Sequence, residues 1–185
     1  MRSHVLVLCS LVLVGFAARL LPHAWNFTPV IATVVLAGVY ARPRWLALAA
    51  CFTGLWLSDF VLNNYVWSQP GQGLSLFGNW GVYLAVALVA GLPAVSGANA
   101  RSSWAELGGL GLGGAAIFYL VTNTQVWLSS GMYSPDAAGL LTSLVAGFPF
   151  FLKTLASTLL FGALAVTGIR YLTPAPRVAV VPLEA

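Results

Sequence analysis

Charged residues are the scarcest class in this sequence. They make up 6% of the 185 residues, with eight basic and four acidic side chains, whereas hydrophobic residues make up 59%. A soluble domain carries about 25% charged residues, so most of this surface does not face water. The composition therefore excludes a soluble globular domain and predicts a polytopic membrane protein. At about 20 residues per transmembrane helix, the chain holds roughly six helices and no separate soluble domain.

Residues that bind metals or perform catalysis are also few. The two histidines, His4 and His23, and the two cysteines, Cys9 and Cys51, lack the paired spacing of metal ligands, so we predict no metal site and no cofactor. There is no phosphate-binding loop, and Ser130 with His23 is a weak match to a serine protease pair. We therefore predict that the protein is not an enzyme. Its net charge of +4 is explained by membrane topology and does not indicate nucleic-acid binding.

The apolar runs predict an all-α fold, with one integral membrane domain over residues 1–185 built as a bundle of six transmembrane helices. The predicted spans cover about residues 5–21, 27–41, 45–65, 80–95, 105–128 and 150–172. Pro149 interrupts the last apolar stretch, and residues 137–147 before it are too few to cross a bilayer. We therefore predict a short interfacial or re-entrant helix before the last span.

The basic residues predict the orientation of this bundle. Lysine and arginine near helix ends are enriched on the cytoplasmic side of a membrane. If both termini are cytoplasmic, the six spans place six of the eight basic residues on that side: Arg2, Arg42, Arg44, Arg101, Arg170 and Arg177. We therefore predict a multi-pass protein of the bacterial inner (plasma) membrane with both termini inside the cell.

Polar and aromatic residues gather in three segments that this topology places on the outer side, residues 19–26, 59–67 and 122–133. Together with a lysine in the last span, they supply eight candidate ligand-binding residues: Arg19, His23, Asn26, Asp59, Asn63, Asn123, Trp127 and Lys153. An ionised side chain at the bilayer centre costs about 2.5–3.5 kcal/mol, so the charged members need partners or water. One interpretation is an outward-facing pocket where Arg19 or Lys153 pairs with a carboxylate or phosphate of the solute and aromatic residues stack on its ring. The other is an ion pair of Asp59 with Lys153 or Arg19 that only locks the bundle.

Several motifs carry a resemblance to a known family. They include RLLPH at residues 19–23, LSD at 57–59, FYLVTN at 118–123 and GFPFF at 147–151. This order resembles an uncharacterised bacterial domain-of-unknown-function family described as membrane transport proteins, with departures at residues 24–25 and 124–125. The layout is also similar to the S components of energy-coupling-factor vitamin transporters. That similarity implies a vitamin-like solute bound from outside, and a separate transmembrane coupling subunit and ATPases that supply energy.

These observations predict that the protein is the substrate-binding component of a transport system for a small solute. Its predicted partners are membrane lipid, the solute and a coupling module, and we predict no nucleic-acid partner. The alternative is a membrane scaffold or assembly protein that transports nothing and whose polar cluster is structural. The scaffold predicts a closed, fully paired cluster without a cavity. A lone carrier would gain support from inverted repeats, which the sequence does not show.

Overall fold

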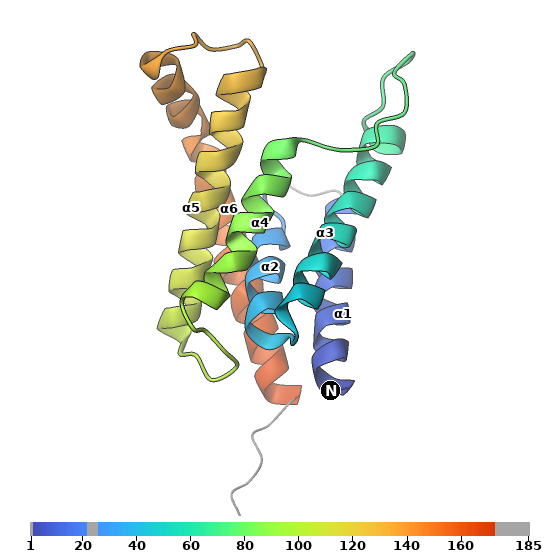
Figure 1. The fold of residues 1–185 in the computed structure, drawn as a ribbon, viewed down its shortest axis with the longest axis vertical. Coiled ribbons are helices and arrows are strands. Elements are labelled where there is room, and N and C mark those ends of the chain that lie inside the picture. The colour runs from blue at the N-terminus through green and yellow to red at the C-terminus, as the bar shows by residue number, and fades with distance from the viewer. Residues whose placement is uncertain (1, 22–25, 173–185) are drawn as a thin grey trace, which may run out of the picture.

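The computed structural model describes residues 2–21 and 26–172 of the chain, and within them every regular element is helical (Figure 1). The chain forms α1 (Arg2–Ala17), a 3-10 turn η1 (Ala18–Leu20), α2 (Val30–Tyr40), α3 (Arg44–Val61), a π-helical turn η2 (Leu62–Val66), α4 (Trp80–Val95), α5 (Trp104–Ser129) and α6 (Ala137–Leu172). The predicted all-α fold is confirmed. Among the described residues, three segments are long and apolar enough to cross a membrane, residues 44–66, 104–129 and 137–171.

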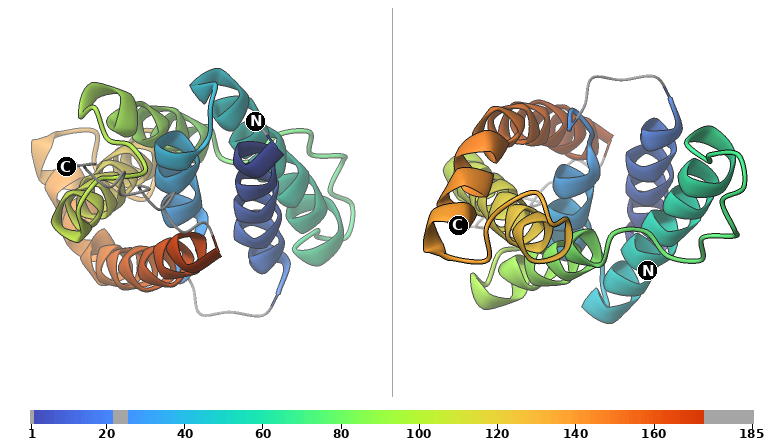
Figure 2. Two further views of the ribbon diagram at one scale, coloured as in Figure 1. Left: turned by 90° about the horizontal axis from the view of Figure 1, so that it is seen from below. Right: turned by 90° about the horizontal axis from the view of Figure 1, so that it is seen from above.

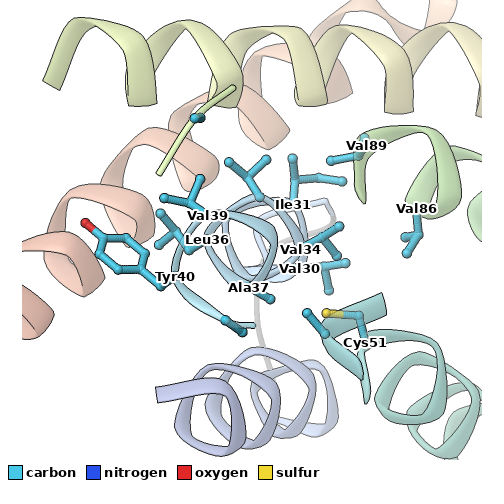
Figure 3. Packing of buried hydrophobic residues seen from close by; sticks show 14 of the residues in the cluster. Val30, Ile31, Val34, Leu36, Ala37, Val39, Tyr40, Cys51, Val86 and Val89 are labelled. Atoms are coloured by element: carbon cyan, nitrogen blue, oxygen red, sulfur yellow. The ribbon is translucent and has the colours of Figure 1, made fainter. Parts of the chain in front are cut away.

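Helix α2 lies at the centre of the bundle, with α1 and α3 on one side and α4, α5 and α6 on the other (Figures 1 and 2). All of its 11 residues are buried. A helix that is apolar on every face is stable only when other helices surround it, and the sequence of α2, VIATVVLAGVY, has no charged residue. Figure 3 shows valine, leucine and isoleucine side chains of α2 packing outward against Val86 and Val89 of α4 and Cys51 of α3.

Helix α2 is also short. At 1.5 Å per residue its 11 residues extend about 16 Å, about half of the roughly 30 Å hydrocarbon core of a bilayer. Its neighbours α3, α5 and α6 are longer and continue past its first residue toward the upper end of the bundle, where α3 and α5 finish and α4 and α6 begin (Figure 1). The start of α2 therefore lies inside the bundle.

The prediction of a separate short helix before the last span is wrong. Residues 137–172 form one continuous helix, α6, with Pro149 inside it. The N-terminal part of α6 is held by α5, since Tyr119 Oη donates to the carbonyl of Leu144 at 2.5 Å and Ser143 Oγ donates to the carbonyl of Asn123 at 2.9 Å. Proline is tolerated in apolar helices when neighbouring helices hydrogen-bond to the backbone near it. These contacts hold the N-terminal part of α6 against α5, and α6 continues through Pro149, where the sequence alone indicates a break.

Two arginines bind the carboxyl ends of helices at the lower end of the bundle. Arg42 Nη1 donates to the carbonyls of Gly38 at 2.9 Å and Val39 at 3.2 Å, in the last turn of α2. Arg44 Nη2 donates to the carbonyl of Pro93 in α4 at 3.2 Å. The last carbonyls of a helix lack intrahelical partners and carry partial negative charge, so these cations stabilise the end of each helix.

Candidate functional site

A cavity of about 160 Å³ lies at the N-terminal end of α2, inside the bundle. Its wall is formed by residues of α2, α3, α4, α5 and α6, together with Arg19 of η1, Leu62 of η2 and the segment before α2. Four lining residues are polar and six are apolar: Arg19, Asn26, Thr28, Thr154, Val30, Ile31, Leu55, Leu62, Val82 and Phe118. A polar group at one end of an otherwise apolar cavity is the usual composition of a small-molecule site.

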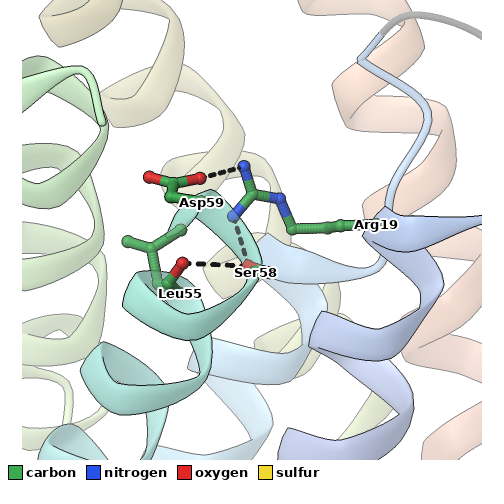
Figure 4. A network of polar contacts seen from close by, with 4 residues as sticks. All are labelled: Arg19, Leu55, Ser58 and Asp59. Carbon is green, nitrogen blue, oxygen red and sulfur yellow. Dashed lines mark hydrogen bonds and ion pairs between the residues drawn. The ribbon is translucent and has the colours of Figure 1, made fainter. Parts of the chain in front are cut away.

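The charged group of the cavity is Arg19, which the turn η1 places beside α3 (Figure 4). Its Nη1 donates to Ser58 Oγ at 2.7 Å, and its Nη2 forms an ion pair with Asp59 Oδ1 at 2.5 Å. The side chains of Arg19 and Asp59 are only 15% and 8% exposed. Ser58 Oγ in turn donates to the carbonyl of Leu55 at 2.9 Å. The charges are therefore buried as a neutral, hydrogen-bonded pair, the form in which a membrane interior tolerates them.

The guanidinium of Arg19 has capacity left for a further partner. A guanidinium carries five N–H groups, and the hydrogen bonds to Ser58 and Asp59 use two of them. Within the described part of the chain, the remaining donors have no hydrogen-bond partner. Because Arg19 lines the cavity, these donors are available to a molecule bound there.

The other oxygen of Asp59 lies against the segment that joins α3 to α4. A Cβ atom placed on Gly78 would lie 2.3 Å from Asp59 Oδ2, so only glycine fits at this position. The same segment is attached to α3 by Asn64, whose amide donates to the carbonyl of Ser75 at 2.7 Å and accepts from its N–H at 2.8 Å. Asp59 therefore connects α3 to η1 through Arg19 and contacts the segment 67–79 at Gly78.

The first turn of α2 forms the floor of the cavity. Its N-cap residue is Pro29, and no side chain caps this end of the helix. The first N–H groups of a helix have no intrahelical partner and give the end a partial positive charge. Val30 and Ile31, which carry two of these N–H groups, line the cavity. Opposite them, Thr154 of α6 donates weakly to the carbonyl of Asn26 at 3.4 Å. The cavity therefore combines an arginine with uncapped backbone donors.

The structure brings three of the eight predicted residues together. Arg19 and Asn26 line the cavity, and Asp59 holds Arg19 in place. Of the two partners expected for Asp59, it is Arg19 and not Lys153 that forms the ion pair. His23 lies outside the described residues.

The other four predicted residues lie away from the cavity. Asn63 belongs to η2 and does not line it. Asn123 donates to the carbonyl of Tyr119 at 2.8 Å and packs on Gly147 of α6, and Trp127 Nε1 donates to the carbonyl of Ser134 at 2.8 Å. Lys153 is exposed, with its ammonium 5.7 Å from the centre of the Phe150 ring. A role for these residues in ligand binding stays a prediction without support from their positions.

Sequence analysis missed two hydroxyl residues of the cavity, Thr28 and Thr154. Thr154 belongs to a buried stripe on α6 that also includes Ser143, Gly147 and Ser157, at spacings of four, seven and three residues. Such spacing marks one face of a helix, and small polar residues along an apolar helix indicate a packed face. That signal was available in the sequence. Whether Thr28 reaches the cavity depends on where the ends of α2 lie within the bundle, and the sequence does not reveal that.

Comparison with known proteins identifies a family for the chain. The model of a family of unknown function, DUF6580, matches residues 1–180, so the chain belongs to this family. No curated protein and no solved structure matches the chain.

Proposed function

We propose that this DUF6580 protein is a multi-pass plasma-membrane protein that binds a small organic anion in the cavity, as the solute-binding component of a transport system. It acts by binding and not by catalysis. The observation that carries the proposal is a cavity inside an apolar bundle that contains a cation, Arg19, with unused donors next to the uncapped end of a buried helix.

The volume of the cavity limits the size of the solute. About 160 Å³ is close to the roughly 150 Å³ of an engineered apolar cavity that holds benzene, and below the roughly 300–1,000 Å³ of drug-sized ligand sites. A molecule of about six non-hydrogen atoms therefore fits. A vitamin-sized solute would fit only if the upper end of the bundle opened, which requires the segment 67–79 to separate from Asp59 and Asn64.

The electrostatics of the cavity favour an anion. The charges of Arg19 and Asp59 cancel each other, and the N-terminal end of α2 adds a partial positive charge of about half an elementary unit. A carboxylate placed here would accept hydrogen bonds from Arg19 and from the first N–H groups of α2. The hydroxyl groups of Thr28 and Thr154 complete the polar lining. Broken or buried helix ends bind carboxylates in this way in membrane transporters.

The topology in this proposal is six spans with both termini cytoplasmic. The turns between α2 and α3 and between α4 and α5, and the end of α6, lie at one end of the bundle and carry Arg42, Arg44, Arg101 and Arg170 (Figure 1). The positive-inside rule assigns this end to the cytoplasm. The cavity then lies in the outer half of the membrane, where a solute enters from outside. Energy for uptake comes from a separate transmembrane coupling subunit with ATPases, as the layout similarity implies.

The experiment uses the full chain, purified in mild detergent. Native mass spectrometry first identifies any molecule that copurifies.

Thermal unfolding is then measured with propionate, lactate and the uncharged analogue propionamide. The carboxylates should raise the unfolding temperature and propionamide should not, because it lacks the charge that the cavity favours. The double variant Arg19→Gln/Asp59→Asn, which removes both charges together, should lose this effect, whereas Lys153→Gln, which removes an exposed cation, should keep it. A protein with no copurified solute and no response to carboxylates would contradict the proposal.

The scaffold function is the second candidate, and one observation favours it. Arg19 is paired with Asp59, and the amide of Asn123 and the indole of Trp127 are already bound to backbone carbonyls. A scaffold does not use the cavity. If Val82→Phe, which fills the cavity from α4, leaves both growth on limiting solute and assembly with partners unchanged, the cavity has no role and the scaffold is favoured.

A further inference from the structure

A second, apolar groove lies on the other side of the bundle, where α5 and α6 cover α2. Its volume is about 180 Å³. The side chains along part of its wall are small, because four lining residues from α5 and α6 are glycine or alanine: Gly108, Gly111, Gly162 and Ala163. Leu159 and Trp104, which also line the groove, are 44% and 51% exposed. The groove therefore reaches the outer surface of the bundle, which in a membrane faces lipid.

The lower end of the groove carries a cation. On α6, Thr158, Gly162 and Val166 line the groove at intervals of four residues, and Arg170 follows at the next interval on the same face. The guanidinium of Arg170 lies 5.0 Å from the centre of the Trp104 ring and donates to the carbonyl of Ser102 at 2.5 Å. The ring of Trp104 is itself part of the groove wall. An arginine beside a tryptophan is a typical arrangement at the membrane–water interface.

The groove and the arginine below it together extend over about one leaflet of a bilayer. Thr158 and Arg170 are 12 residues apart on one helix, or about 18 Å at 1.5 Å per residue. Half of the roughly 30 Å hydrocarbon core is about 15 Å. A hydrocarbon tail of leaflet length can therefore lie along α6 with its head beside Arg170, with part of the tail in the groove and the rest on the outer surface of the bundle.

We propose that this groove is a binding site for an anionic phospholipid of the leaflet that contacts the lower end of the bundle, with one acyl chain between α5 and α6 and its phosphate at Arg170. Charge complementarity supports an anionic lipid, because the described residues at this end include Arg42, Arg44 and Arg101 in addition to Arg170, against one acidic residue, Glu106. Within the described part of the chain, one N–H group of Arg170 is hydrogen-bonded, which leaves four for a phosphate. The inference does not depend on the proposed solute site.

Thr158 supplies a test of which molecule occupies the groove. Its hydroxyl is buried and has no hydrogen-bond partner among the described residues. A hydrocarbon chain offers that hydroxyl nothing, so Thr158→Val, which keeps the shape and removes the hydroxyl, should leave lipid binding unchanged. Loss of binding in this variant would mean that the occupant has a polar group at this depth, and would overturn the acyl-chain assignment.

The experiment measures lipid binding to the full chain after delipidation in detergent, by native mass spectrometry with dioleoyl phosphatidylglycerol and dioleoyl phosphatidylcholine. The unmodified protein should bind one phosphatidylglycerol in preference to phosphatidylcholine. Arg170→Gln should reduce that preference about fivefold, the value of one arginine near a phosphate. Arg170→Lys keeps the charge and should retain most of the preference, which separates a loss of charge from a loss of folding.

Two neighbouring glycines of α5 provide a matched pair of variants for the groove itself. A Cβ atom on Gly108 or on Gly109 meets no other atom within 4 Å, so both positions accept a larger side chain. Gly108 lines the groove and Gly109 does not. Gly108→Leu should abolish most of the lipid binding, since its side chain takes the place of part of the acyl chain and removes the contacts of that chain with the groove wall, and Gly109→Leu should not. Equal binding by the two variants, or equal binding of the two lipids to the unmodified protein, would refute the proposal.

Discussion

The ion pair of Arg19 with Asp59 allows a quantitative prediction. Removing one partner of a buried ion pair costs about 3–5 kcal/mol, because it leaves an uncompensated charge out of water. Arg19 remains 15% exposed, so we expect the lower end of that range, about 3 kcal/mol of unfolding free energy, for each of Arg19→Gln and Asp59→Asn. This loss lowers the ratio of folded to unfolded protein by about two orders of magnitude.

The double variant Arg19→Gln/Asp59→Asn distinguishes a coupled pair from two independent charges. If the two residues acted independently, it would lose about 6 kcal/mol, the sum of the single effects. We expect a loss below about 3 kcal/mol, smaller than that of either single variant, since the double variant leaves no unpaired charge and its two amides can still hydrogen-bond. Unfolding in mixed micelles of dodecyl maltoside and sodium dodecyl sulfate, followed by the fluorescence of the seven tryptophans, measures these free energies. Additive losses, or single losses below about 1 kcal/mol, would refute the assignment of this pair as buried and coupled.

Three further predictions concern other contacts. Gly147→Ala places a Cβ atom 2.1 Å from Asn123 Oδ1, so it should cost about 1–3 kcal/mol, and Asn123→Ala should restore most of that loss in a double-mutant cycle. Gly78→Ala forces its Cβ atom onto Asp59 Oδ2, and faster proteolysis within residues 67–79 should report release of this segment. Asp136 accepts hydrogen bonds from the Gly139 N–H and Ser134 Oγ, which lower its pKa below the usual value. Its stabilisation is therefore present above the unfolded pKa of about 3.9 and is lost as the pH falls through the folded pKa, so the stability difference from Asp136→Asn should be constant from pH 5 to 7 and shrink below pH 4.

The boundaries of most helices could be predicted from the sequence, because each depends on local signals. The predicted span 80–95 has the same bounds as α4, whose first turn is capped by Asn79 Oδ1 accepting from the Gly81 N–H at 2.9 Å. The predicted start of the fifth span near residue 105 lies one residue from that of α5, where Ser103 and Glu106 form a capping box. The break predicted at Pro149 was wrong, since α6 continues through this residue and packs on α5 through the hydrogen bonds of Tyr119 and Ser143. Such tertiary contacts have no local signature in the sequence.

The candidate site could be predicted only where charge in a membrane requires a partner. Arg19 and Asp59 were recognisable because an ionised residue in an apolar span is costly, and the two partners considered for Asp59 included the one that it has. Asn123 and Trp127 were candidates because they are polar, but in an apolar bundle amides and indoles also bond to backbone carbonyls of their own or neighbouring segments, as both do here. Their role in ligand binding stays a prediction. Polarity identifies which residues need a partner, and only the packing decides whether that partner is protein or solute.

The position of the cavity follows from the length of α2 more than from any polar residue. A helix that is apolar on all faces must be enclosed, and the helices that enclose it are longer than its 11 residues. The N-terminal end of α2 therefore lies inside the bundle and does not reach the ends of the longer helices around it. Pro29 supplies no side-chain cap there, and water is scarce. Uncapped N–H groups in such a place are costly unless something accepts their hydrogen bonds. The same geometry places Arg19, in the turn that follows α1, beside those donors in the wall of one cavity. Arg19 and the first turn of α2 line one space that an anion of matching size would fill, and for this reason we favour a binding site over a purely structural cluster.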